Sequence, residues 1–212
     1  MTAKRVLLVD DHAIVRDGLR NLLTEEFSAP VIGEAGNAAD AARMVTEQDW
    51  DLAVLDISLG GRGGLELIKE LKEIRPRMRV LVLSMHSEEQ YARRAFKAGA
   101  SGYITKDRPR AELTSAIARV AAGGRYVSAD LAERLVGDYA RVGNFSPHEA
   151  LSDREFEVMR LIASGHSIKD IAALLALSDR TVSTYRARLL EKMDLKTNAE
   201  LTRYALHNNL IE

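Results

Sequence analysis

Short apolar runs, unbroken by polar residues, recur through the first half of the chain, and each ends in a polar residue. Runs of this kind are typical of strands buried on both faces, and such strands occur in parallel sheets that are covered by helices. The four clearest runs span residues 6–9, 52–55, 80–83 and 102–105, and they lead into Asp10-Asp11, Asp56, Ser84 and Lys106. We therefore expect a parallel sheet that presents polar residues at its strand ends.

Strand and helix patterns alternate over about the first 122 residues, and this alternation predicts the fold class. The strand patterns lie near 5–10, 31–35, 52–56, 80–84 and 102–106, and the helical patterns lie near 13–25, 37–48, 64–74, 87–98 and 110–122. Five strand–helix units of this size predict an α/β doubly wound parallel five-stranded sheet with strand order 2-1-3-4-5.

The pattern changes after Ala122, where Gly123-Gly124 breaks the last of these helices. Ser128 is expected to cap a short helix that contains Leu131, Leu135 and Val136, and residues 143–147 read as linker. Only helices are expected beyond Leu151, near 153–164, 168–175, 179–193 and 198–208. We therefore expect an α/β domain over 1–122, a linker with a short helix over 123–147, and a small all-α domain over 148–212.

Composition is typical of a globular protein and excludes only a few classes of chemistry. The 212 residues include 46 % hydrophobic residues and carry a formal net charge of −1, which is ordinary for globular protein and identifies no partner. The absence of cysteine excludes disulfides, thiolate metal sites and thiol catalysis. No apolar stretch reaches the roughly 18 residues that span a bilayer, and no signal-peptide pattern is present. We expect a soluble, cytoplasmic protein without a membrane partner.

The polar residues at the strand ends predict a site for magnesium and phosphate. In an open parallel sheet the ligand lies outside the carboxyl ends of the strands, so these side chains should meet at one edge. Mg²⁺ prefers carboxylate oxygens and water. Asp11 is the expected direct ligand, Asp10 is expected to act through water, and Asp56 can both bind the metal and attack phosphorus. Lys106 would pair with a phosphate oxygen, and the Ser84 hydroxyl would donate to another.

Each of these residues also has a common structural explanation when it is considered alone. An aspartate after an apolar run, such as Asp56, is most often a turn residue or a helix cap. Lys106 alone would most often be a solvated loop lysine, Ser84 a helix cap, and His12 the residue that starts a helix. The complete set at four strand ends of one sheet is much more specific than any member.

Residues 4–122 resemble the receiver domain of two-component response regulators, which has a flavodoxin-like fold. The resemblance lies in Asp10-Asp11-His12 with Arg16-Asp17-Gly18-Leu19, in Asp56 and Ser84, and in the run from Gly99 to Lys106. It implies that a sensor histidine kinase phosphorylates Asp56, and that Asp11, Asp56 and the backbone carbonyl of Ser58 bind Mg²⁺. It also implies that Ser84 and Tyr103 are switch residues.

One position departs from the receiver pattern. The family usually has proline four residues after the acceptor, whereas this chain has Gly60, followed by Gly61. Glycine frees the backbone dihedral angles that proline would fix. We expect a more mobile loop beside the phosphate, with consequences for phosphorylation kinetics.

The spacing of apolar residues in the C-terminal region predicts a helix-turn-helix. One face of the first helix is marked by Ile168, Ile171, Ala172 and Leu175. After a cap at Ser178, the next is expected to bury Val182, Tyr185, Leu189 and Met193. The opposite side of this second helix would enter the DNA major groove, and it carries Arg180, Ser183, Thr184, Ala187 and Arg188.

Charge leaves a second interpretation of this region open, because residues 148–212 hold nine lysines and arginines against ten acidic residues. A solvated helix in a protein-interaction domain would fit the same pattern. The LuxR-type helix-turn-helix nevertheless resembles the segments 151–158, 168–172, 181–185 and 191–193, and the whole chain is similar to NarL/FixJ-class regulators.

The resemblance implies two kinds of DNA contact. Contacts to phosphates need only charge or a hydrogen-bond donor, and they are expected from Lys169, Thr181, Arg188 and Lys192. Base contacts carry over less directly, because Ser183 and Ala187 stand where many relatives have lysine, and Ile168 stands where the familiar motif has asparagine.

We interpret the chain as a phosphorylation-activated transcription factor that binds DNA as a homodimer. It is not expected to be a metabolic enzyme, although the receiver assists its own phosphorylation and dephosphorylation. Two alternatives remain at this stage. An aspartyl-phosphate phosphatase often uses Asp-x-Asp, but the second acid is absent here, where Asp56 is followed by Ile57 and Ser58. A receiver joined to a protein-binding helical module would bind no DNA at low salt.

Overall fold

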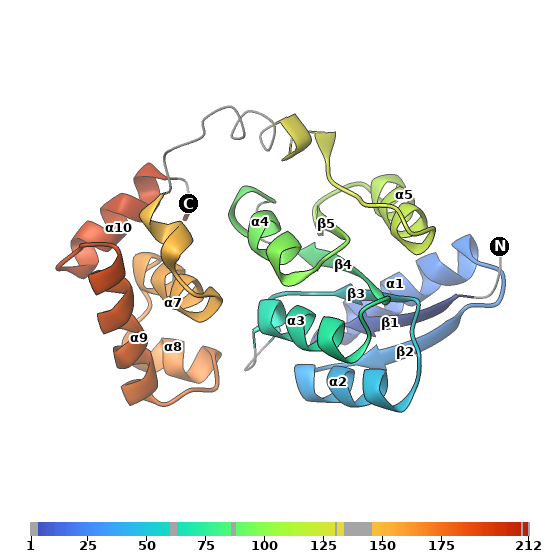
Figure 1. Cartoon of the computed structure of the whole chain (residues 1–212), viewed down its shortest axis with the longest axis horizontal. Coiled ribbons are helices and arrows are strands. Elements are labelled where there is room, and N and C mark those ends of the chain that lie inside the picture. Colours follow the sequence, from blue (N-terminus) through green and yellow to red (C-terminus); the bar gives the residue numbers. More distant parts are fainter. Residues whose placement is uncertain are drawn as a thin grey trace. The chain divides into compact units, whose positions relative to one another are not determined.

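The computed structural model describes residues 4–59, 63–85, 88–129, 131–133, 146–208 and 210–211 (Figure 1). The chain forms two compact units, Met1–Ala140 and Arg141–Glu212. No helix in the described part of the chain is both long enough and apolar enough to cross a membrane.

The N-terminal unit is built on a five-stranded parallel sheet with the order β2-β1-β3-β4-β5 (Figure 1). The strands are β1 (Arg5–Val9), β2 (Val31–Ala35), β3 (Leu52–Leu55), β4 (Arg79–Ser84) and β5 (Gly102–Thr105). In the three central strands, β1, β3 and β4, nearly every residue is buried. This is the pattern of a sheet that is covered on both faces, so the predicted strand order and fold class are confirmed.

Helices cover both faces of this sheet. They are α1 (Ala13–Glu26), α2 (Ala38–Glu47), α3 (Gly64–Ile74), α4 (Glu88–Ala98) and α5 (Arg110–Ala121). Helices α1 and α5 bury Leu22, Leu23, Ile117 and Val120 in one cluster with the strand residues Leu8, Val54 and Leu81. Helices α2, α3 and α4 lie on the other face, as Figure 1 shows. All of these helices start and end within two residues of their predicted limits.

The segment after α5 returns to the edge of the sheet. Gly123 has a positive φ of 93° and ends the helix. Tyr126 then forms a bridge beside β5: its N–H donates to the Ser101 carbonyl (3.1 Å), and its carbonyl accepts from the Tyr103 N–H (3.3 Å). The Ser128 hydroxyl accepts from the Leu131 N–H (3.1 Å), as expected for a helix cap. The other expected residues of that helix, Leu135 and Val136, and linker residues 143–145 lie outside the described residues.

The C-terminal unit consists of short helices around its own core. They are η1 (Pro147–Ala150), α7 (Asp153–Ala163), α8 (Ile168–Leu174), α9 (Asp179–Lys192) and α10 (Asn198–His207). Ser152, Ser167, Ser178 and Thr197 each cap the helix that follows by accepting a backbone N–H. The core contains Phe156, Met159, Ile171, Val182, Leu189 and Leu201. The four helices expected beyond Leu151 are confirmed.

Gly64, at the start of α3, packs against the backbone of Ile57, the residue after Asp56. A Cβ added there would overlap the backbone of Ile57, whereas a Cβ on Gly18 in α1 would meet no atom within 4 Å. We expect Gly64→Ala to lower the free energy of unfolding by about 1–3 kcal/mol. Gly18→Ala should raise it by about 0.5–1 kcal/mol, because alanine favours a helix interior. Urea unfolding followed by the fluorescence of Trp50, the single tryptophan, measures both, and equal effects would contradict the packing argument.

Candidate functional site

The carboxyl edge of the sheet holds one lysine between two carboxylates. The Lys106 Nζ donates to Asp10 Oδ2 (2.7 Å) and to Asp56 Oδ2 (2.6 Å). Both carboxyl side chains are only 2 % exposed, and the lysine side chain is 12 % exposed. Burial lowers the pKa of Lys106, but its hydrogen bonds to Asp10 and Asp56 outweigh this effect and hold the pKa above its ordinary value. The lysine is therefore a fixed positive charge beside Asp56.

Asp11 lies on the solvent side of the same cluster. Its side chain is 38 % exposed, and its Oδ1 is 2.7 Å from the His12 Nδ1. His12 is the N-cap of α1, as expected, and its N–H donates to Asp10 Oδ1 (2.8 Å). Ligand atoms of Asp10, Asp11, His12 and Asp56 all lie within 4.8 Å of one another. Three carboxylates against one lysine leave an excess of negative charge, so these oxygen donors fit a hard divalent cation.

Three further predicted residues lie in or next to the strands that form this edge. Ser84 is fully buried at the end of β4, and its carbonyl accepts from the Lys106 N–H (2.8 Å). Tyr103, in β5, is also fully buried. Ser58 is exposed, and its N–H donates to Asp56 Oδ1 (2.9 Å), which places its backbone beside the acceptor candidate. Gly60 and Gly61 lie outside the described residues.

Arg16 also contacts this site, although no role at the site was predicted for it. Its Nη1 donates to the backbone carbonyl of Asp10 (2.7 Å), and its Nε donates to Glu34 in β2 (3.1 Å). Arg16 lies in the first turn of the helix that follows Asp10 and Asp11, and this proximity in sequence could have drawn attention to it. Glu34 could not have been identified, because its proximity depends on the register of β2 against β1, which the strand order does not give.

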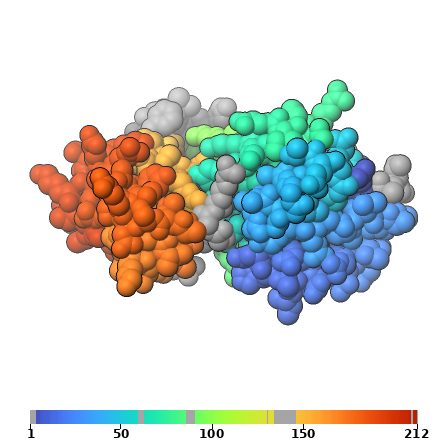
Figure 2. Space-filling model, turned by 90° about the horizontal axis from the view of Figure 1, so that it is seen from below, coloured from blue at the N-terminus to red at the C-terminus, as the bar shows by residue number. Residues whose placement is uncertain are grey.

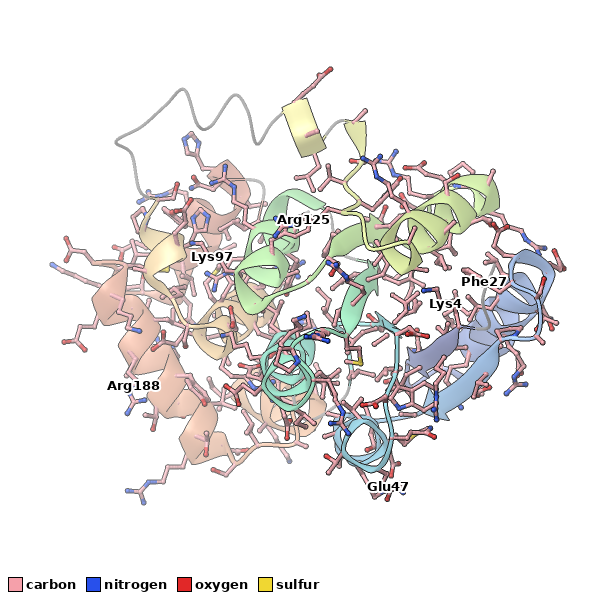
Figure 3. All side chains as sticks on the ribbon, turned by 45° about the vertical axis from the view of Figure 1, so that its right-hand side comes forward. Lys4, Phe27, Glu47, Lys97, Arg125 and Arg188 are labelled. Carbon is pink, nitrogen blue, oxygen red and sulfur yellow. The ribbon has the colours of Figure 1, made fainter. Side chains whose placement is uncertain are left out.

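The outer face of α9 carries the predicted DNA-facing residues. Arg180, Ser183, Thr184, Ala187 and Arg188 are all exposed. Figure 3 shows Arg188 pointing away from the body of its unit, and residues of α8 and α9, drawn in orange tones, form much of the face of this unit seen in Figure 2. A hollow of about 280 Å³ is lined by Ser178, Arg180, Thr181, Thr184, Tyr185 and Arg188. Its lining contains two arginines and no carboxylate.

Tyr185 was expected to face inward, but it is only half-buried and lines this hollow. Leu190, which was not assigned to the core, is buried instead. The reason is that α9 packs against both α7 and α8, so its buried stripe is wider and turned relative to the expected one. Val182, Leu189 and Met193 are buried as predicted.

The two hydroxyls on this face are engaged by their own helix. The Ser183 Oγ donates to the Asp179 carbonyl (2.8 Å), and the Thr184 Oγ1 donates to the Arg180 carbonyl (2.9 Å). Such bonds to the preceding turn are common for these residue types. Since each hydroxyl has one hydrogen, both side chains offer mainly acceptor lone pairs to a ligand.

Lys192 makes an ion pair within the unit, although it was expected to contact DNA phosphate. Its Nζ is 2.6 Å from Glu155 Oε2, and Glu155 also accepts the Ser152 N–H (2.8 Å) in the capping box of α7. Burial raises the pKa of Glu155, but the bonds from Lys192 and Ser152 outweigh it and hold that pKa below its ordinary value. Lys169, by contrast, is exposed.

A doubly wound domain with an acidic cluster at its carboxyl edge, followed by a helix-turn-helix unit, defines a class of signalling regulators. Comparisons with known proteins agree. Residues 6–118 match the family described as response regulator receiver domain, and residues 149–205 match bacterial regulatory proteins of the luxR family. The chain belongs to the two-component response regulators that carry a LuxR-type DNA-binding domain.

Relatives along the whole length support this assignment. Response regulator GacA from Pseudomonas aeruginosa is 34 % identical over 209 residues, which cover 98 % of both chains. Response regulator UvrY from Escherichia coli is 34 % identical over 206 residues, covering 97 % of this chain and 94 % of that one. RcsB from Salmonella enterica, solved on a promoter with phosphomimetic BeF3-, aligns with a TM-score of 0.64 at 25 % identity, covering 95 % of this chain and 98 % of RcsB. The protein is a transcription factor controlled by phosphorylation, not a metabolic enzyme.

The Lys192–Glu155 pair generates a prediction with a defined pH dependence. In Lys192→Met, Glu155 keeps a buried charge without its partner, so unit stability at pH 7 should fall by about 1–3 kcal/mol. Because the pKa of Glu155 is depressed in the folded wild type, its stabilisation is present above about pH 4.5 and is lost as the pH falls through the lowered value. The difference between wild type and variant should therefore shrink on acidification.

Amide hydrogen exchange of α9 in the full chain measures this difference at pH 7 and below the ordinary pKa of glutamate. Lys169→Met is the matched control, because it removes an exposed charge, and we expect it to stay within about 0.5 kcal/mol of wild type. A destabilisation of Lys192→Met that is independent of pH would show that lost packing, not the ion pair, is responsible.

Proposed function

We propose that Asp56 is the phospho-acceptor and that a sensor histidine kinase in the cytoplasm is the donor. A carboxylate oxygen of Asp56 would bond to phosphorus as the bond from phosphorus to the kinase histidine breaks. The observation that carries this proposal is the position of Lys106, which holds a fixed charge against a buried Asp56 at the sheet edge. The receiver is proposed at residues 1–122, the linker at 123–147 and the DNA-binding domain at 148–212.

Mg²⁺ is the proposed cofactor of this site, where it would neutralise charge on the transferred group. Asp11, Asp56 and the backbone carbonyl of Ser58 would hold it directly. Asp10 would act through water, and its contacts support this indirect role: one of its carboxylate oxygens accepts from Lys106 and the other from His12.

After transfer, Lys106 would exchange its bond to Asp56 for one to a phosphoryl oxygen, and the Ser84 hydroxyl would donate to another. The same groups would assist hydrolysis of the acyl phosphate by the receiver itself. Ser84 and Tyr103 are the proposed switch residues. Their complete burial supports this role, because a buried side chain that moves must be accommodated by its neighbours.

We further propose that α9 enters the major groove of double-stranded DNA and that the activated protein binds as a homodimer. A single helix-turn-helix reads a short half-site, so two related half-sites give useful specificity. RcsB, which shares this fold, was solved bound to promoter DNA. Lys169, Thr181, Arg188 and Lys192 are proposed to contact phosphates, and Arg180, Ser183, Thr184 and Ala187 are proposed to face the base edges.

Phosphorylation of Asp56 can be tested directly. With Mg²⁺ and a small acyl phosphate, we expect the protein to gain one phosphate, and Asp56→Asn, which keeps the shape without the nucleophile, to gain none. Intact-mass measurement reads both results. Equal phosphorylation of the variant would identify another acceptor, and continuous release of phosphate at many turnovers per minute would favour a phosphatase.

The two kinds of DNA contact should separate under changes of salt and sequence. Arg188→Ala should weaken binding to all sites alike and reduce the salt dependence by about one unit of slope. Thr184→Ala should change which site is preferred, by about 1–3 kcal/mol per altered base contact. Binding of the phosphorylated protein to a panel of sites at several salt concentrations distinguishes them. A uniform loss for Thr184→Ala would assign that residue to the backbone instead.

A further inference from the structure

Arg16 lies where two loops of the receiver meet beside the acidic cluster. It is in the first turn of α1, and its side chain is only 18 % exposed. Its guanidinium donates to the Asp10 carbonyl (2.7 Å) from Nη1 and to the Glu34 carboxylate (3.1 Å) from Nε. Glu34 thus orients the guanidinium, and Arg20 also forms an ion pair with Glu34.

The carbonyl that Arg16 holds belongs to the peptide group between Asp10 and Asp11. This group is planar, so fixing its oxygen fixes the plane from which both residues extend. On one side, the Asp10 side chain bonds Lys106 and His12. On the other side, the Asp11 carboxylate is exposed and has no strand to hold it. A rotation of this peptide would therefore move the Asp11 carboxylate relative to Asp56.

We propose that Arg16 is a positioning residue that holds the Asp10–Asp11 peptide and thereby sets the affinity of the acidic cluster for a divalent cation. This inference rests on the metal site proposed above. Groups that hold metal ligands from outside the coordination sphere commonly change metal affinity by about 10–100-fold when they are removed. Arg16 fits that role because its guanidinium makes a charge-assisted bond directly to the Asp10 carbonyl, in the peptide group that leads to Asp11.

Arg20 supplies a matched control on the same helix. It pairs with Glu34 and with Asp17 (3.2 Å), and its side chain is 48 % exposed. It is one helical turn farther from the site, and its described contacts are to these two carboxylates rather than to the Asp10 carbonyl. Arg16→Met and Arg20→Met each remove one arginine from Glu34 and leave the other. Only Arg16→Met removes a bond to Asp10, whereas Arg20→Met removes the exposed pair with Asp17.

The experiment uses the full chain and two measurements. The first is amide hydrogen exchange of His12 without metal, because the His12 N–H donates to Asp10 and reports the order of this turn. The second is the Kd for Mg²⁺ by isothermal titration calorimetry. For Arg16→Met we expect faster exchange at His12 and a Kd raised by about tenfold or more. For Arg20→Met we expect both values within about twofold of wild type.

Equal changes in the two arginine variants, or no change in Arg16→Met, would overturn the inference. Should Arg16→Met fail to fold, Glu34→Gln tests the same clamp: it should speed His12 exchange and weaken Mg²⁺ binding, and wild-type values would again overturn the proposal. If the wild type itself binds no Mg²⁺, the proposed metal site fails, while the metal-free exchange of His12 still decides whether Arg16 orders the turn.

Discussion

The ion pair of Lys106 with Asp10 and Asp56 is the interaction on which the receiver site depends. It joins the ends of β5, β1 and β3, and the Ser84 carbonyl at the end of β4 binds the backbone of the same lysine. Two carboxylates buried so close together would be costly without a positive charge between them. The Lys106 ammonium supplies that charge by bonding one oxygen of each carboxylate. The contacts of Lys106 therefore fix the geometry of the site and also hold the ends of these strands together.

The sequence was sufficient for the fold because its signals are local. Unbroken apolar strands, serine and threonine caps, and glycines at helix ends each specify their own element, and strand order follows from the way such units wind. The Asp10, Asp56 and Lys106 cluster was also predictable, since residues that follow parallel strands must arrive at one edge. Arg16–Glu34 and Lys192–Glu155 were not predictable, because each joins residues whose proximity arises only from tertiary packing. Tyr185 was misplaced because periodicity gives the spacing of a buried stripe but not the direction in which the neighbouring helices turn it.

In the C-terminal unit, the two sides of α9 differ: one side packs against the core and the other is exposed. Val182 and Leu189 fix it to the core, and Ser178 fixes its start. On the outer side, Ser183 and Thr184 satisfy their hydrogens within the helix, so the arginines Arg180 and Arg188 supply the donors there. The face therefore offers the hydroxyl oxygens of Ser183 and Thr184 as acceptors and the longer arginine side chains as charged donors. Lys192 belongs to both sides, because its charge lies at the end of α9 and also neutralises Glu155 in α7.

The bridge of Tyr126 to β5 affects how easily the edge of the sheet can pair with a strand of another chain. An exposed edge strand is a template on which another chain can add a strand, and this is a common route to aggregation. Here the Ser101 carbonyl and the Tyr103 N–H are already bonded to Tyr126, whose hydroxyl is anchored in turn on Glu112 (2.7 Å). A foreign strand would have to break these bonds before it could pair with β5. The chain that leaves the receiver thus protects the β5 edge of the sheet against the addition of a foreign strand.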